Sequence, residues 1–213
     1  MTLDLTVDEL LNSTRSVRKR LDFDKPVPHE VLIECLDLAL QAPTGSNAQG
    51  WQWVFVEDPE KKKALADIYR TNATPYLNQP KPAHGDIRDE QMGAVRNSAM
   101  YLNENMEKAP VLMIPCLEGR PDGYDVGMQA SYWGSLLPAV WSFMLALRSR
   151  GLGSAWTTLH LIGDGEKQAA DLLGIPFEDF AQGGLFPVAY TVGTNFKPAK
   201  RLRAEQLTHW DTW

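Results

Sequence analysis

Apolar residues at helical spacing predict two helices near the start of the chain. The first begins with the capping box Thr6-Val7-Asp8-Glu9, and its apolar positions continue toward Val17, so it is expected to lead straight into the basic segment TRSVRKR at 14–20. Pro26 and Pro28 break this pattern. A second helix follows, with Val31, Leu32, Cys35, Leu36, Ala39 and Leu40 facing inward, and it ends at the irregular stretch APTGSNAQG (42–50).

The next stretch alternates between strand and helix patterns. WQWVFVE (51–57) is aromatic and β-branched and predicts a strand, after which Asp58-Pro59 begins a helix expected to run through Tyr69. Residues 71–91 are polar, rich in proline and without a period, so we interpret them as a lid or a variable insertion. A helical segment ending near Lys108 leads to a second predicted strand, APVLMIPCL (109–117).

The segment SYWGSLLPAVWSFMLALRSRG (131–151) is apolar on nearly every side. Its apolar core of about 17 residues reaches only the lower limit for a membrane span and contains Ser135, Pro138 and Ser142. We therefore favour a helix at the centre of a domain or of a dimer, and no membrane partner. Arg148, Arg150 and Gly151 mark its C-terminal end.

The last third predicts two more strands and one helix. SAWTTLHL (154–161) is a candidate third strand, Asp164 can cap a short helix that closes at Gly174, and LFPVAYTVGT (185–194) is a further strand. Neither a repeat nor a linker is visible, so residues 1–213 are expected to form one domain. Helices and strands alternate irregularly, which favours a mixed α+β sandwich over a doubly wound parallel sheet.

Composition narrows the function classes. A chain of 213 residues with 44% hydrophobic residues can bury a sizeable core, and a net charge of -6 argues against a protein that coats nucleic acid. The start, MTLDLTVDELL, carries acidic residues where a secretory signal carries Lys or Arg, so a cytoplasmic location is expected.

Several common site motifs are missing from the sequence. It contains no G-x-x-x-x-G-K-[ST] and no G-x-G-x-x-G after a strand, and its four histidines fit no metal-ligand spacing. Cys35 and Cys116 each lie in an apolar run, which favours buried free thiols over a disulfide or a catalytic thiol. A metal enzyme and a dinucleotide-binding fold are therefore not supported.

Two basic segments lie at opposite ends of this acidic chain. One contains Arg15, Arg18, Lys19 and Arg20, and the other Lys197, Lys200, Arg201 and Arg203. A phosphate monoester favours several such side chains converging from different segments, and Ser16 could add a neutral donor. The alternative for Lys19 and Arg20 is a solvated helix end, where cations are favoured by the helix dipole.

Four motifs in order along the chain resemble those of the FMN-dependent nitroreductase family. RSVRKR resembles R-R-S-[VI]-R-x-[FY], and APTGSNAQGW resembles a-P-[ST]-x-x-N-x-Q-[PG]-W. RSRGLGSAWTTL resembles the segment G-L-G-[ST]-x-W, and PAKRLRAEQLTHW resembles the closing R-x-P-L-E-E-x-x-H-W. The resemblance covers nearly the whole chain.

The resemblance implies a three-layer α+β sandwich, with a central mixed or antiparallel sheet flanked by helices, in an intertwined homodimer. Two FMN molecules would lie at the subunit interface, each held by both chains. Matched position by position, the implied FMN-binding residues are Arg15, Ser16, Val17, Arg18, Pro43, Thr44, Gly45, Ser46, Asn47, Gln49, Thr158, Leu159, Lys200 and Arg201. No catalytic side chain and no metal is implied.

Three departures from the family pattern affect this match. Gly50 stands where many relatives have proline, and Arg203 stands where the closing motif often has proline. The choice among Lys200, Arg201 and Arg203 as phosphate contacts therefore stays open. Trp156, Thr157 and Thr158 replace a continuation that is often rich in glycine, which affects the contacts with the flavin face.

The implied activity is hydride transfer from NADH or NADPH to FMN, followed by reduction of a nitroaromatic, a quinone or a similar small oxidant. Asn47 and Gln49 would hydrogen-bond to the flavin ring, and solvent would supply protons. The alternatives are a non-catalytic flavin-binding protein and a same-fold enzyme of other chemistry, such as dehalogenation, flavin fragmentation or deazaflavin-dependent reduction. A nucleic-acid module using RSVRKR is disfavoured by the acidic balance.

Overall fold

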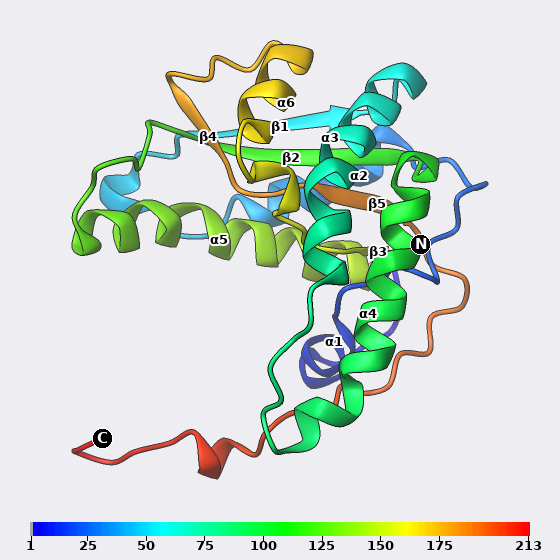
Figure 1. Ribbon diagram of the computed structural model, residues 1–213, viewed down its shortest axis with the longest axis vertical. Coiled ribbons are helices and arrows are strands. Elements are labelled where there is room, and N and C mark those ends of the chain that lie inside the picture. Colours follow the sequence, from blue (N-terminus) through cyan, green and yellow to red (C-terminus); the bar gives the residue numbers. More distant parts are fainter. Residues whose placement is uncertain (1) are drawn as a thin grey trace.

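The computed structural model describes residues 2–213 and is built on one antiparallel sheet (Figure 1). The strand order is β1-β2-β5-β3, and β4 pairs with the far end of β2. The strands are β1 (Trp51–Val56), β2 (Val111–Glu118), β3 (Leu152–Ser154), β4 (Phe180–Gln182) and β5 (Phe186–Tyr190). The predicted α+β sandwich is confirmed, and its sheet is antiparallel throughout the described strands.

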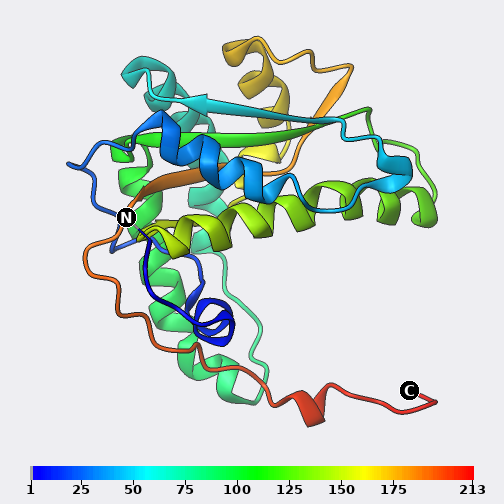
Figure 2. The same ribbon diagram turned by 180° about the vertical axis from the view of Figure 1, so that it is seen from behind.

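Helices cover both faces of the sheet (Figures 1 and 2). The α-helices are α1 (Val7–Ser13), α2 (His29–Ala39), α3 (Pro59–Asn78), α4 (Ile87–Asn105), α5 (Val126–Ser149) and α6 (Gly165–Leu173). Short 3-10 turns are η1 (Gly45–Asn47), η2 (Met106–Lys108), η3 (Leu159–Leu161) and η4 (Ala204–Gln206). The predicted caps are present at Thr6 with Glu9, at Asp58 and at the left-handed Gly174. Asp164 occupies the N-cap position of α6, but its side chain makes no capping hydrogen bond.

The central strand β2 supplies a core to each face of the sheet. Its side chains alternate, so that Leu112, Ile114 and Cys116 pack toward α3, α4 and α6, whereas Val111, Met113 and Leu117 pack toward α2 and α5. All six are at most 5% exposed. A strand buried on both faces reads as a continuous apolar run, which is what APVLMIPCL contains.

The long apolar helix α5 belongs to one of these cores. It is the one helix in residues 2–213 that is long and apolar enough to cross a membrane by length and composition, a test that core helices of soluble proteins also pass. Phe143 and Leu147 pack with α2 and the sheet, as expected for a core helix. Leu137 and Trp141, one turn apart, are exposed on another face of α5.

The structure corrects the prediction for residues 71–91. Helix α3 continues past Tyr69 to Asn78, and only residues 79–86 connect it to α4. Tyr69, Ala73 and Leu77 extend one buried face at four-residue spacing. This burial offsets the hydrogen bond that Pro75 cannot donate inside the helix, so the polar composition of the exposed positions was misleading.

Two further predictions change in the structure. The first helix ends at Ser13, and residues 15–20 are not helical. The third strand is Leu152–Ser154 rather than 154–161, because the chain turns into η3 at Leu159, and the short strand β4 was not predicted at all. Both cysteines are buried and free, as predicted, and burial raises the pKa of Cys35 to about 11 and that of Cys116 to about 12.

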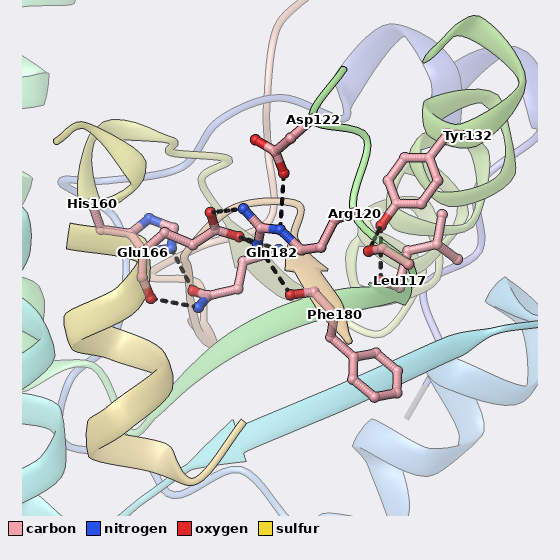
Figure 3. Close-up of polar contacts among 9 residues, drawn as sticks. Leu117, Arg120, Asp122, Tyr132, His160, Glu166, Phe180 and Gln182 are labelled. Atoms are coloured by element: carbon pink, nitrogen blue, oxygen red, sulfur yellow. Dashed lines mark hydrogen bonds and ion pairs between the residues drawn. The ribbon is translucent and has the colours of Figure 1, made fainter. Parts of the chain in front are cut away.

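A polar network ties α6 and β4 to the segment that leaves β2 (Figure 3). The Arg120 guanidinium donates to both carboxylate oxygens of Glu166, at 2.9 and 3.1 Å, and to Asp122 at 2.9 Å. Glu166 also accepts from the backbone N–H of Gln182 at 2.9 Å. A bidentate arginine–carboxylate pair fixes direction as well as distance, so this network sets where the β2–α5 connection lies.

His160 ends this network in a fully buried position. The Gln182 amide donates its N–H to the Glu166 carbonyl at 2.8 Å, so its oxygen faces His160 and accepts from Nε2–H at 3.1 Å. Nδ1 is then the unprotonated nitrogen, and it has no hydrogen-bond partner within residues 2–213. Burial lowers the pKa of His160 to about 4, an effect that the Gln182 hydrogen bond partly opposes.

The low pKa of His160 predicts a loss of stability in acid. Below its unfolded pKa of about 6.5, the unfolded chain binds a proton that the folded chain does not, so stability falls as the pH drops from 6.5 toward 4. Between pH 8 and pH 5 this group should lower the free energy of unfolding by about 2 kcal/mol.

Urea denaturation of the wild type and of His160→Gln at both pH values measures this contribution. The variant should show a smaller fall by about that amount, since the acidic residues that also titrate are common to both proteins. Equal falls in the two proteins would contradict the assignment.

Candidate functional site

The segment that carries Arg15 and Arg18 runs beside the edge strand β3 and forms backbone hydrogen bonds with it. The Val17 N–H donates to the Ser154 carbonyl at 2.8 Å, and Ser16 forms a parallel bridge with Ser154. Gly153 permits this close approach, since a Cβ there would meet the Val17 Cβ at 2.9 Å. Val17 is buried, so its neighbours are held in place beside the sheet.

Arg15 is half buried, and part of its guanidinium group is not satisfied by residues 2–213. Its Nε and Nη2 atoms are buried and have no hydrogen-bond partner within residues 2–213. Burial lowers the pKa of Arg15, and the positive charge of Arg201 lowers it further. A buried donor without an acceptor is costly, so this position calls for an anionic ligand.

Arg18 lies in the same hollow and also lacks a carboxylate partner among the described residues. Its Nη1 donates to the Ser98 Oγ of α4 at 3.3 Å. Burial lowers its pKa, an effect that the neighbouring Tyr69 opposes. The hollow has a volume of about 430 Å³ and is lined by Arg15, Ser16, Val17, Arg18, Lys19, Arg20, Ser98, Asn195, Phe196 and Lys197. We call it the anion hollow.

The other cations of the basic segment differ in role. Lys19 is exposed at the rim of the anion hollow, where it is free to contact solvent. Arg20 is structural, because it donates to the Val192 carbonyl at 2.9 Å and to the Asn195 carbonyl at 3.1 Å and covers the Phe196 ring. The segment is not a helix end, so the helix dipole does not account for either residue.

The structure distinguishes the three C-terminal cations. Lys200 pairs with Glu90 at 3.2 Å and Arg203 pairs with Glu205 at 3.3 Å. Arg201 has no carboxylate partner among residues 2–213, and it lies near enough to Arg15 to affect its pKa. Of the three, Arg201 is therefore the one whose charge acts on Arg15, although its exposed side chain lines a neighbouring hollow beside Arg88 and not the anion hollow itself.

The loop 43–49 is an exposed and conformationally strained segment. Ser46, Asn47 and Gln49 have φ angles of 53°, 54° and 51°, in the left-handed region that residues other than glycine rarely adopt. The Gln49 amide donates to Asn47 Oδ1 at 3.0 Å, and the Gln49 N–H donates to Thr44 Oγ1 at 3.2 Å. Strain of this kind is typical of sites where a loop must present polar groups to a ligand.

Helix α5 holds the loop in place. The Gly45 N–H donates to Ser135 Oγ at 2.9 Å, and that hydroxyl donates to the Ser131 carbonyl. Beside the loop lies a cavity of about 350 Å³ lined by residues that include Thr44, Ser46, Gln49, Glu118, Tyr124 and Tyr132. Figure 3 shows the Tyr132 hydroxyl at the end of β2, where it lies 2.8 Å from the Leu117 carbonyl and 2.7 Å from that of Gly119.

Thr158 and Leu159 follow β3 but line neither the anion hollow nor the loop cavity. Thr158 is exposed, whereas Leu159 is half buried against the core. The hydroxyl group of the preceding Thr157 already donates a hydrogen bond to the Leu185 carbonyl, at 2.7 Å. Pro43 is exposed at the start of the loop.

The segment 15–20, which lines the anion hollow, and the loop 43–49 lie near opposite ends of α5 (Figure 2). The loop is tied to Ser135, whereas the basic segment begins next to Ser13, which accepts from Arg148 Nε at 3.1 Å. Residues 135 and 148 are about 20 Å apart along the helix at 1.5 Å per residue. The two groups of predicted site residues are therefore not brought together within one chain.

Sequence reasoning missed the residues that hold these two parts in position. Ser98 accepts from Arg18, and Ser131 with Ser135 anchors the loop. Ser131 and Ser135 are polar positions four residues apart on an otherwise apolar helix, a signal that was visible in the sequence. Ser98 gave no comparable signal, because its neighbour in the site is 80 residues away.

Comparison with known proteins places this geometry in a family. Residues 11–190 match the model of the nitroreductase family. A 5,6-dimethylbenzimidazole synthase from Rhodospirillum rubrum is 29% identical over 159 residues, 72% of this chain and 69% of that protein. An NADH dehydrogenase from Thermus thermophilus is 26% identical over 210 residues, 92% of this chain and 91% of that protein.

Solved structures agree on the fold. An iodotyrosine deiodinase bound to FMN and 3-iodo-L-tyrosine superposes with a TM-score of 0.72 at 22% identity, over 98% of this chain and all of that one. An FMN- and NADPH-dependent nitroreductase from Sphigopyxis sp. strain HMH gives a TM-score of 0.71 at 20% identity, with the same coverage. The family match over most of the chain and the shared sandwich lead to one conclusion: this protein is a member of the nitroreductase family.

Proposed function

We propose that the protein is an FMN-dependent oxidoreductase of the cytoplasm that takes electrons from NAD(P)H and passes them to a small oxidant such as a nitroaromatic or a quinone. The observation that carries the proposal is the pair of buried Arg15 nitrogens, Nε and Nη2, which have no hydrogen-bond partner within residues 2–213. They lie next to Arg18, and the charge of Arg201 acts on Arg15. Arg15, Arg18 and Arg201 have no carboxylate partner among residues 2–213, and three such cations fit the phosphate of FMN. Among relatives of this fold, one deiodinase structure contains FMN.

Each part of the site has a distinct task in this proposal. Arg15, Arg18 and Arg201 hold the phosphate, and Ser16, exposed beside them, adds a hydroxyl donor. Asn47 and Gln49 present amide groups to the carbonyls and ring nitrogens of the flavin, where donors stabilise negative charge. When bound, FMN supplies reversible hydride acceptance. No side-chain acid or base is required, since solvent can supply protons.

The separation of the two parts supports a shared site in a homodimer. Ser135 anchors the loop and Arg148 contacts Ser13, just before the basic segment, and Ser135 and Arg148 are about 20 Å apart along α5. One FMN is not expected to bridge both parts of a single chain, so the loop that contacts its ring would come from a second copy. The exposed apolar face of α5, with Leu137 and Trp141, offers a surface for that copy.

The first test of the proposal is the visible spectrum of the purified protein under anaerobic conditions. We expect a flavin spectrum that bleaches when NADPH or NADH is added and returns when a nitroaromatic or a quinone is supplied. Flavin that stays oxidised with both nucleotides would favour a binding role or another donor. A protein that neither contains nor takes up FMN would contradict the proposal.

Replacing Arg15 and Arg18 together by alanine should release FMN without unfolding the protein. Two charge-assisted contacts contribute about 1.5 to 3 kcal/mol each, so the dissociation constant measured by flavin fluorescence should rise at least 100-fold. Lys19→Ala is the matched control, because Lys19 lines the same hollow but is exposed. The control should bind FMN like the wild type, and an unchanged affinity in the double variant would exclude the anion hollow as the phosphate site.

Mixed dimers test whether two chains build one site. One chain carries Arg15→Ala with Arg18→Ala, and the other carries Asn47→Ala with Gln49→Ala. If each site combines the hollow of one chain with the loop of the other, the mixed dimer contains one intact site, although neither parent homodimer contains any. It should bind one FMN per dimer with wild-type affinity. Loss of both sites in the mixed dimer, or a flavin-loaded monomer by sedimentation, would contradict the shared site.

A further inference from the structure

A groove outside the two parts of the flavin site lies between α3 and α4. Its volume of about 620 Å³ falls in the range of small-molecule pockets. The walls are the end of α3, the connection 79–86 and one face of α4. Most lining side chains are apolar or aromatic: Tyr76, Leu77, Pro82, Ala83, Met92, Val95 and Ala99. We call it the α3–α4 groove.

Two cations at one end of this groove lack a carboxylate partner among the described residues. Lys81 Nζ lies 3.4 Å from the centre of the Tyr76 ring and donates to the Tyr76 carbonyl at 3.2 Å. The Arg96 guanidinium has one weak contact, with Asn78 Oδ1 at 3.4 Å. Tyr76 and Asn78 both belong to the last turn of α3, so the two cations gather at the same end.

The acidic residue of the groove is already satisfied. Asp89 accepts from the backbone N–H groups of His84, at 2.9 Å, and Gly85, at 2.7 Å, and these hydrogen bonds lower its pKa. Asp86, which caps α4, is paired with Arg88. Asp89 keeps its negative charge, so Lys81 and Arg96 leave the lining of the groove with a net charge of +1, although the chain as a whole is acidic.

We propose that the α3–α4 groove binds a small aromatic carboxylate, and that it selects electron acceptors of this class. The apolar walls and the Tyr76 ring suit a flat aromatic body, and Lys81 with Arg96 suits a carboxylate at one end. The groove shares α4 with the anion hollow, since Ala99 lines the groove and the adjacent Ser98 contacts Arg18. The role in acceptor selection rests on the proposed function, whereas binding itself does not.

Calorimetric titration of the oxidised, FMN-loaded protein separates binding from turnover. The probes are 4-nitrobenzoate and the neutral, similarly shaped 4-nitrobenzamide, with no nucleotide present. We expect the wild type to bind the anion about 5- to 10-fold more tightly, a preference that falls as salt is added. Lys81→Gln with Arg96→Gln should remove this preference and leave the affinity for the amide unchanged.

Lys63→Gln is the matched control, because Lys63 is an exposed lysine near the opposite end of α3. It should keep the preference of the wild type. Steady-state kinetics should agree: the double variant raises the KM for 4-nitrobenzoate by a similar factor and leaves kcat and the KM for the amide within twofold.

Each outcome decides between the two proposals. A preference in binding that the double variant loses supports the groove even if NAD(P)H reduces nothing, in which case the proposed function alone fails. Turnover of both probes with no preference, or a preference that survives in the double variant, overturns the groove and leaves the proposed function standing. Displacement of FMN by 4-nitrobenzoate would assign the anion to the hollow at Arg15 instead. Absence of binding because a second chain covers the groove would also overturn it.

Discussion

The candidate site depends on two guanidinium groups that are held partly out of water and that no carboxylate of residues 2–213 neutralises. Desolvation penalises the charged form of Arg15 and Arg18, and Arg201 adds a repulsive charge to the first of them. A chain that folds with this arrangement carries a cost that an anionic ligand would relieve. The fold tolerates the cost because the segment is fixed by backbone hydrogen bonds to β3 and by the burial of Val17.

The rest of the architecture holds that segment and the loop 43–49 at a fixed separation. Strand β2 divides the core into two halves, and α5 spans one half from Ser135, which anchors the loop, to Arg148, which contacts Ser13. The Arg120–Glu166 pair and the buried His160 hold the connection after β2, which forms the wall of the loop cavity. This frame fixes the positions of the basic segment and the loop 43–49, which are remote from each other in the sequence.

Helix α4 lies between the anion hollow and residues 71–86, the region whose structure differs most from its sequence-based interpretation. Residues 71–78 complete α3, and the following turn places Lys81 beside Tyr76. Ser98 and Ala99, adjacent in sequence, face the anion hollow and the α3–α4 groove respectively. The two hollows are therefore separated by α4 alone, and this proximity is the reason for proposing that the α3–α4 groove takes part in acceptor selection.

The sequence alone determined those elements whose signals come from neighbouring residues in the chain. The caps at Thr6, Asp58 and Gly174, the apolar run of β2 and the all-round apolar α5 follow from side-chain chemistry and periodicity, and motif order indicated the family. Tertiary structure decided what depends on burial and distance. The helix through Pro75 forms because Ala73 and Leu77 are buried, and β4 forms because β2 offers an unpaired edge. Arg201 differs from Lys200 through contacts that only the folded chain creates, because Glu90 pairs with Lys200 whereas the charge of Arg201 acts on Arg15. Such energies depend on separation in space and not on order in the sequence.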